Sequence, residues 1–187
     1  MEARRLEERY TYSDYCTWDD SERWELIDGV AYAMAGVSES HQDVLIELLG
    51  QLRDFLKGKQ CKVFVAPFDV RFNADGADDT VVQPDILVVC DRTKLESGKG
   101  VIGAPDFIIE ILSPSTAKYD MLTKKRLYQQ SGVREYWIVD PDSKTMAANV
   151  LHDGRYNSRF FDYHDSAVPI EALDGCTINL AEVFDVS

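Results

Sequence analysis

Two acidic residues, Asp85 and Glu110, lie at or inside two strongly apolar segments of the sequence. Asp85 directly precedes the apolar run 86–90, and Glu110 interrupts the apolar run 107–112. An ionised carboxylate that is buried without a partner is costly, so the fold must supply a metal ion, a cation or a raised pKa. The first of these options describes a divalent-metal site.

A lysine on a predicted helix offers a positive partner for these acids. At 100° per residue, Lys124 falls on the apolar face of the predicted helix 120–131. Lys125 lies toward the edge of that face, where a lysine needs no partner. A lysine that points into the core needs an anion, and Glu110 and Asp85 are the nearest candidates.

Two carboxylates and a lysine have a chemical rationale in phosphodiester hydrolysis. The carboxylates can hold Mg²⁺, which prefers oxygen ligands, polarises a phosphoryl oxygen and activates water. The ammonium can position the attacking water or stabilise the charge that develops on the phosphoryl group. A buried structural ion pair between Lys124 and one acid explains the same residues, and the spacings alone leave both interpretations open.

The composition predicts one globular domain over residues 1–187, with residues 1–10 as candidates for disorder. Hydrophobic residues make up 45% of the 187, which is enough for a sizeable core. The apolar runs are far shorter than the roughly 20 residues of a membrane-spanning helix, and the N-terminus is charged throughout. We therefore expect neither a signal peptide nor a membrane segment.

Cysteine spacing and net charge further restrict the class of protein to which the chain can belong. The four cysteines form no C-x-x-C pair, so we expect free thiols in a cytoplasmic protein. A net charge of −13 opposes nonspecific adhesion to nucleic acid. It does not exclude a nuclease, because a bound metal ion cancels part of the local negative charge.

Periodicity and turn residues predict an α/β fold with a mixed sheet. The apolar strands 86–90 and 107–112 are expected at the centre of a helix-flanked sheet. The other predicted elements are a short helix opened by a Thr11–Asp14 capping box, a hairpin at 24–35 around Asp28–Gly29, a helix at 38–57, strands at 62–66, 68–72 and 135–139, a helix at 120–131, and a hairpin of 145–151 with 155–163 around Asp153–Gly154.

Several motifs, taken in chain order, resemble the Uma-two family of restriction-endonuclease-like proteins. The resemblance spans roughly residues 10–141 and continues more loosely to the C-terminus. The motifs that carry it are Trp24–Gly29, His41 at the start of a helix, Pro84–Asp85, Glu110–Ser115, Asp120 with Lys124 and Tyr128, and Gly132–Pro141.

The resemblance implies the PD-(D/E)XK nuclease fold, a central mixed sheet flanked by helices, here with extra β-hairpins near both ends. Asp85 and Glu110 would be the metal carboxylates, with the main-chain carbonyl of Ile111 as a third ligand. The superfamily's usual lysine would fall at Leu112. The related family carries that lysine on the following helix, which matches Lys124.

Residues outside this triad are further candidates for the site. Glu25 would be an accessory acid that binds a second metal ion or orients water, although a solvated hairpin residue is the alternative. His41 would contact phosphate or a neighbouring carboxylate, unless it is an ordinary first-turn residue. Ser113 would cap the next helix or contact a phosphate. Lys125 belongs to a basic cluster near the expected scissile phosphate, although such a face is also commonly just solvated.

The sequence therefore predicts a Mg²⁺- or Mn²⁺-dependent endonuclease that hydrolyses DNA. A homodimer is expected, because nucleases that cut both strands often pair two sites across a two-fold axis. The alternative is a catalytically inactive binding or regulatory module with a structural Asp/Glu–Lys ion pair. A metal-dependent phosphodiesterase that acts on RNA or a small nucleotide would use the same residues.

Overall fold

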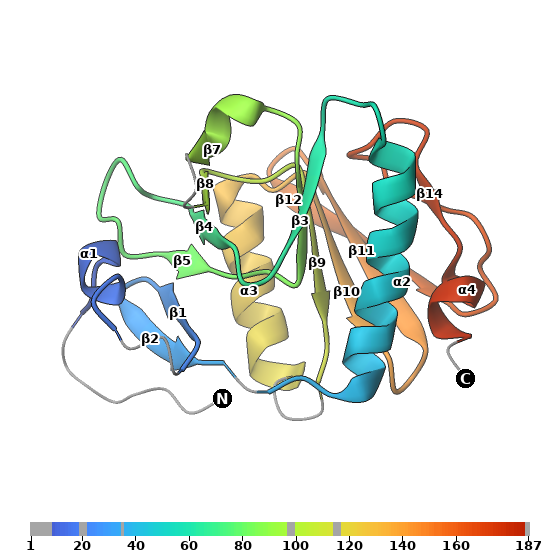
Figure 1. Ribbon diagram of the computed structural model, residues 1–187, viewed down its shortest axis with the longest axis horizontal. Coiled ribbons are helices and arrows are strands. Elements are labelled where there is room, and N and C mark those ends of the chain that lie inside the picture. The colour runs from blue at the N-terminus through green and yellow to red at the C-terminus, as the bar shows by residue number, and fades with distance from the viewer. Residues whose placement is uncertain (1–8, 19–21, 35, 97–99, 114–116, 186–187) are drawn as a thin grey trace.

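A mixed six-stranded sheet forms the centre of the computed structural model (Figure 1). The model describes residues 9–18, 22–34, 36–96, 100–113 and 117–185. Only β9 and β10 pair in parallel; the other neighbours in this sheet are antiparallel. The strand order is β12 (Arg155–Asp162), β11 (Thr145–His152), β10 (Glu135–Asp140), β9 (Phe107–Ile111), β6 (Ile86–Val89) and β3 (Lys62–Val65).

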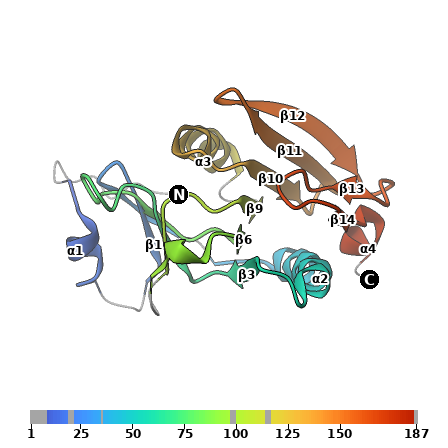
Figure 2. The ribbon, with the colours of Figure 1, turned by 90° about the horizontal axis from the view of Figure 1, so that it is seen from above.

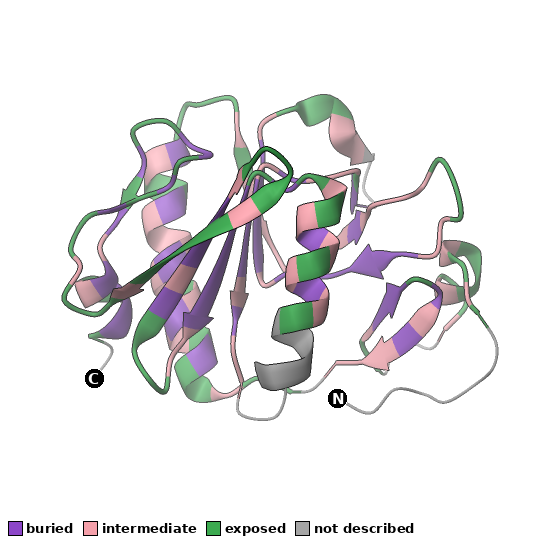
Figure 3. Cartoon of the chain, turned by 180° about the vertical axis from the view of Figure 1, so that it is seen from behind, coloured by how far each residue is buried: buried purple, intermediate pink, exposed green. Residues whose placement is uncertain are grey.

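Two long helices, α2 (Glu39–Leu56) and α3 (Ala117–Ser131), cover opposite faces of this sheet (Figure 2). Side chains alternate across a strand, so Ile109 packs in the cluster under α2 while Ile108 packs in the cluster under α3. This burial on both faces confirms the position predicted for the two apolar strands (Figure 3). Among the described residues, no helix is long and apolar enough to span a membrane.

The C-terminal segment packs against the α2 face. Helix α4 (Leu180–Phe184) contacts α2 and adds buried side chains to the same cluster. It follows a small antiparallel pair, β13 (Val168–Pro169) and β14 (Thr177–Ile178). This C-terminal segment therefore completes the hydrophobic core on the α2 face of the sheet.

A second six-stranded sheet extends the N-terminal hairpin. Its order is β2 (Val30–Ala33), β1 (Trp24–Ile27), β5 (Val81–Val82), β4 (Asp69–Arg71), β8 (Gly100–Ile102) and β7 (Leu95–Glu96). The sequence predicted its hairpin but no element between the strands expected at 86–90 and 107–112. That region contains a 3₁₀ turn, η1 (Arg92–Lys94), the two-residue edge strand β7, and the three-residue strand β8, which lies between β4 and β7. Such strands are too short to show an alternating pattern.

The local turn and cap signals are confirmed. Helix α1 (Tyr12–Tyr15) carries the reciprocal capping box of Thr11 and Asp14. Both predicted hairpin turns have positive φ at their two central residues, at 28–29 and 153–154, as type I′ turns require. Helix α2 begins after its cap Ser38 as expected, and α3 begins at Ala117, three positions before the predicted start.

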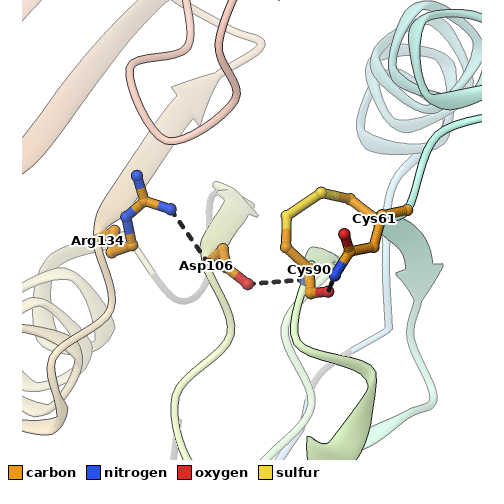
Figure 4. Close-up of a disulfide and its surroundings, with 5 residues drawn as sticks. Cys61, Cys90, Asp106 and Arg134 are labelled. Atoms are coloured by element: carbon orange, nitrogen blue, oxygen red, sulfur yellow. Dashed lines mark hydrogen bonds and ion pairs between the residues drawn. A yellow bond between two sulfur atoms is a disulfide. The ribbon is translucent and has the colours of Figure 1, made fainter.

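The prediction of four free thiols was wrong for two cysteines. Cys61 and Cys90 form a disulfide (Figure 4), whereas Cys16 and Cys176 are free. The register of β3 and β6 pairs Lys62 with Val89, so the two flanking cysteines stand opposite each other. A sequence separation of 29 gives no motif from which this pairing can be inferred.

Reducing the Cys61–Cys90 disulfide should lower the free energy of unfolding by about 3 kcal/mol, because the bridge restricts the unfolded chain. Urea denaturation with and without a thiol reductant measures the difference. A double Cys61→Ser, Cys90→Ser variant is the matched control and should unfold at the same urea concentration in both conditions. Equal midpoints for the wild type would contradict the prediction.

Candidate functional site

Lys124 is buried between two carboxylates. Its side chain projects from α3, and only 5% of the residue is exposed. The Nζ atom donates hydrogen bonds to Glu25 Oε1 at 2.9 Å and to Glu110 Oε1 at 3.0 Å. The helical projection therefore placed this lysine correctly. Its second partner is Glu25 rather than Asp85.

Glu25 belongs to the site and is not a solvated hairpin residue. It lies on β1 with 1% of its surface exposed. Its Oε1 atom also accepts the main-chain N–H of Gln83 at 2.9 Å. Its Oε2 atom is buried and has no hydrogen-bond partner within the described part of the chain. A buried carboxylate oxygen without a donor needs a cation or water that the protein itself does not supply.

Asp85 and Glu110 come together at one end of the central strands. The antiparallel register pairs Ile86 with Ile109, and continuing it by one residue sets Asp85 opposite Glu110. Residues opposite each other in a sheet have Cβ atoms about 5 Å apart. Asp85 Oδ2 also accepts the main-chain N–H of Ile111 at 2.8 Å, so the aspartate is fixed to the strand that carries the glutamate.

The charges of the site are strongly coupled. Burial raises the pKa of Glu110 to about 8, helped by the carboxylates of Asp85 and Glu25, while the Lys124 ammonium and the Tyr128 hydroxyl oppose the rise. Burial alone would lower the pKa of Lys124, but Glu110 and Glu25 outweigh it and raise that pKa above its ordinary value. Three carboxylates against one ammonium leave an excess of negative charge when all are ionised.

Tyr128 is a site residue whose role the sequence did not assign. Its hydroxyl donates a 2.6 Å hydrogen bond to Glu110 Oε1, the oxygen that also accepts from Lys124. Tyr128 follows Lys124 by four residues, so both side chains lie on the same face of α3. That spacing was the available signal, but an apolar helix face explains a tyrosine equally well.

Sequence comparison places this chain in a known family. The family model described as "Putative restriction endonuclease", Uma-two, matches residues 11–181. The chain belongs to this family. Among relatives of this Uma-two protein, the uncharacterized protein slr1290 of Synechocystis sp. is 30% identical over 70% of this chain and 68% of its own length. A second uncharacterized protein of Synechocystis sp., sll1609, is 26% identical over 64% of this chain and 67% of its own length.

A solved structure shares the fold of this Uma-two protein. It is the crystal structure of a putative nuclease belonging to DUF820 from Anabaena variabilis ATCC 29413, with a TM-score of 0.76 and 21% sequence identity. The match covers 94% of this chain and 97% of that one. The predicted restriction-endonuclease-like α/β fold is therefore confirmed.

The oxygen atoms of the site suit a hard divalent cation. Asp85 Oδ1 and Glu110 Oε2 accept no hydrogen bond from the described residues, and the unpartnered Glu25 Oε2 adds a third oxygen. Within the described ranges, however, no cluster of three or more His, Cys, Asp or Glu side chains could hold a metal ion. Side chains alone therefore do not complete a shell, and the main-chain carbonyl of Ile111 would have to contribute.

The remaining predicted residues differ in how close they lie to the acids. His41 is buried beside Asp85, which is one of the two contacts expected for it. Ser113 lies two residues after the end of β9. Lys125 Nζ donates to Ser158 Oγ at 2.9 Å and so points toward β12 rather than the acids. Ser115, the last residue of the Glu110–Ser115 motif, lies outside the described residues.

Proposed function

We propose that this Uma-two protein is a Mg²⁺- or Mn²⁺-dependent endonuclease that hydrolyses DNA phosphodiester bonds. The observation that carries the proposal is the buried Lys124 ammonium, held by Glu110 and Glu25 at the end of the sheet where Asp85 also lies. Fixed positive and negative groups at one sheet end can stabilise the charge that develops during phosphoryl transfer.

Asp85, Glu110 and the Ile111 carbonyl would hold the metal ion. When bound, the ion would polarise a phosphoryl oxygen and make water a stronger nucleophile. The raised pKa of Glu110 supports this assignment, because a carboxylate that burial disfavours gains most from a nearby cation. Asp85 is positioned for the task by its hydrogen bond from Ile111.

Lys124 would act as a hydrogen-bond donor and not as a base. Its raised pKa keeps the ammonium charged at neutral pH, so it can orient the attacking water or stabilise the phosphoryl oxygens, but it cannot accept a proton. Glu25 holds the ammonium through Oε1. The buried Oε2 atom of Glu25 is then available to accept a hydrogen bond from water.

Substrate contacts would come from a few residues near the acids. We assign phosphate contacts to Ser113 and Lys125, the latter after it releases Ser158, and we expect two protomers to act on the two DNA strands. With a net charge of −13, binding should depend on local contacts rather than on overall charge. RNA or a small nucleotide would use the same residues.

A specific observation favours a second candidate, an inactive binding module of the same fold. Lys124 already pairs with both Glu25 and Glu110, and the described side chains form no metal-binding cluster. A purely structural ion-pair network would show the same two features. In that case the acids would stabilise the fold and bind no divalent ion.

A calorimetric titration of the wild-type protein with Mn²⁺ tests the proposed function without knowledge of the cleavage sequence. Binding, together with Mn²⁺-dependent nicking of supercoiled plasmid that a chelator stops, would support the endonuclease. No binding at millimolar Mn²⁺, with or without a non-cleavable oligonucleotide, would reject it in favour of the ion-pair module.

A further inference from the structure

Two groups from different elements lie next to the same oxygen atom of Asp85. Oδ2 accepts the N–H of Ile111 at 2.8 Å and lies 3.2 Å from Nε2 of His41. A carboxylate is planar, so fixing Oδ2 between a strand and a helix also fixes the direction of Oδ1. The Oδ1 atom accepts no hydrogen bond from the described residues and is free to bind a ligand.

His41 reaches this position from the first turn of α2. Its main-chain N–H donates to the cap residue, Ser38 Oγ, at 3.2 Å, and only 3% of the residue is exposed. The second ring nitrogen, Nδ1, is buried with no hydrogen-bond partner in the described ranges. The imidazole therefore contacts Asp85 through Nε2 while its Nδ1 atom is buried without a partner.

An unpaired buried nitrogen counts against a purely structural role. A leucine at position 41 would fill a similar volume without leaving a polar atom unsatisfied. A histidine that costs stability at this position is explained if its other nitrogen performs a task. The atom that Nε2 faces is the oxygen of the proposed metal-binding aspartate.

We propose that His41 is a positioning residue for Asp85: the imidazole donates Nε2–H to Oδ2 and so holds Oδ1 in the direction needed to bind a divalent cation. This inference rests on the proposed metal-dependent function. Groups that hydrogen-bond a metal-binding carboxylate fix its orientation, and their loss typically weakens metal affinity by about 10- to 100-fold. With Nε2 engaged by Asp85, His41 does not contact phosphate through that atom.

Three substitutions separate this role from simple packing. Glutamine can place its amide N–H near the position of Nε2, whereas asparagine is too short to do so and leucine has no donor. We expect Mn²⁺ affinity, measured by calorimetry, to fall about 10- to 100-fold in His41→Leu and His41→Asn, and His41→Gln to recover most of it. Without metal, His41→Leu should melt at or above the wild-type temperature, because the unpaired nitrogen is gone.

The matched control is His152→Leu, which removes another histidine that lies near a carboxylate. His152 is exposed and its Nε2 is 3.7 Å from Glu171 Oε2, so its loss should leave Mn²⁺ affinity unchanged. If His41→Leu and His41→Asn both bind Mn²⁺ as tightly as the wild type, the inference about His41 is overturned and the proposed function still stands. Melting temperatures that fall in step with affinity in all three variants would also overturn it, in favour of a structural role. Absence of Mn²⁺ binding by the wild type would overturn the proposed function, and the inference with it.

Discussion

Replacing Glu110 with glutamine is expected to abolish detectable Mn²⁺ binding and to slow DNA cleavage by about 10³-fold or more, which corresponds to about 4 kcal/mol of lost transition-state stabilisation. Glutamine keeps the size of the side chain and an oxygen that can accept from Tyr128. It removes one of the carboxylates that attract the cation. Asp85→Asn should have the same effect on both measurements, because it removes the opposite acid.

The fold should survive the Glu110→Gln change. Burial raises the pKa of Glu110 to about 8, so the protein gains little from its charge near neutral pH, and Lys124 keeps its bond to Glu25. Circular dichroism and urea denaturation check this point. The control is Asp54→Asn, a change of an exposed acid on α2, which should bind Mn²⁺ normally. Glu110→Gln that cleaves DNA at the wild-type rate would refute the metal assignment.

Local sequence patterns located most of the main sheet and part of the site. The apolar runs around Asp85 and Glu110 identified the two central strands, and the helical projection directed Lys124 inward, where the structure has it. These signals arise within a single strand or helix. Each acid precedes or interrupts an apolar stretch, so its unusual environment is visible in the neighbouring residues.

The parts that the sequence did not resolve depend on contacts between distant segments. Glu25 and Lys124 are 99 residues apart, and nothing local to the Trp24–Ile27 strand shows that Glu25 is buried. The Cys61–Cys90 bridge follows from the register of β3 with β6. The contact of His41 with Asp85 likewise requires that the start of α2 meets the start of β6. Such pairings are set by tertiary packing and not by periodicity.

Replacing Lys124 with alanine is expected to lower the free energy of unfolding by about 3 to 5 kcal/mol in the absence of metal, because it leaves the Glu25 carboxylate buried without its cation and Glu110 Oε1 without its ammonium donor. Lys125→Ala is the matched control on the same helix. Its ammonium bonds only to Ser158 among the described residues, so that change should stay within about 0.5 kcal/mol of the wild type. Urea denaturation of the three proteins measures both differences.

The loss of stability in Lys124→Ala should also depend on pH in a defined direction. Burial already raises the pKa of Glu110, and removing the Lys124 ammonium, which opposes that rise, should raise the folded-state pKa further. A raised carboxyl pKa gives stability that is present at low pH and is lost as pH rises through the folded value. Because Glu110 ionises in the folded wild type only near pH 8, the difference between the wild type and Lys124→Ala should grow as pH rises above about 8. A difference that shrinks over this range would show that the carboxylates are not what the lysine stabilises.

Adding Mn²⁺ to the Lys124→Ala variant distinguishes the two functional hypotheses. If the acids form a metal site, the ion can replace the missing positive charge, and saturating Mn²⁺ should restore much of the lost stability through its binding free energy. Cleavage should nevertheless remain far below that of Lys125→Ala, because the donor that orients water or phosphate is absent. If the acids serve only as a structural ion pair, Mn²⁺ should leave the stability of Lys124→Ala unchanged, since those carboxylates would bind no ion in the folded protein.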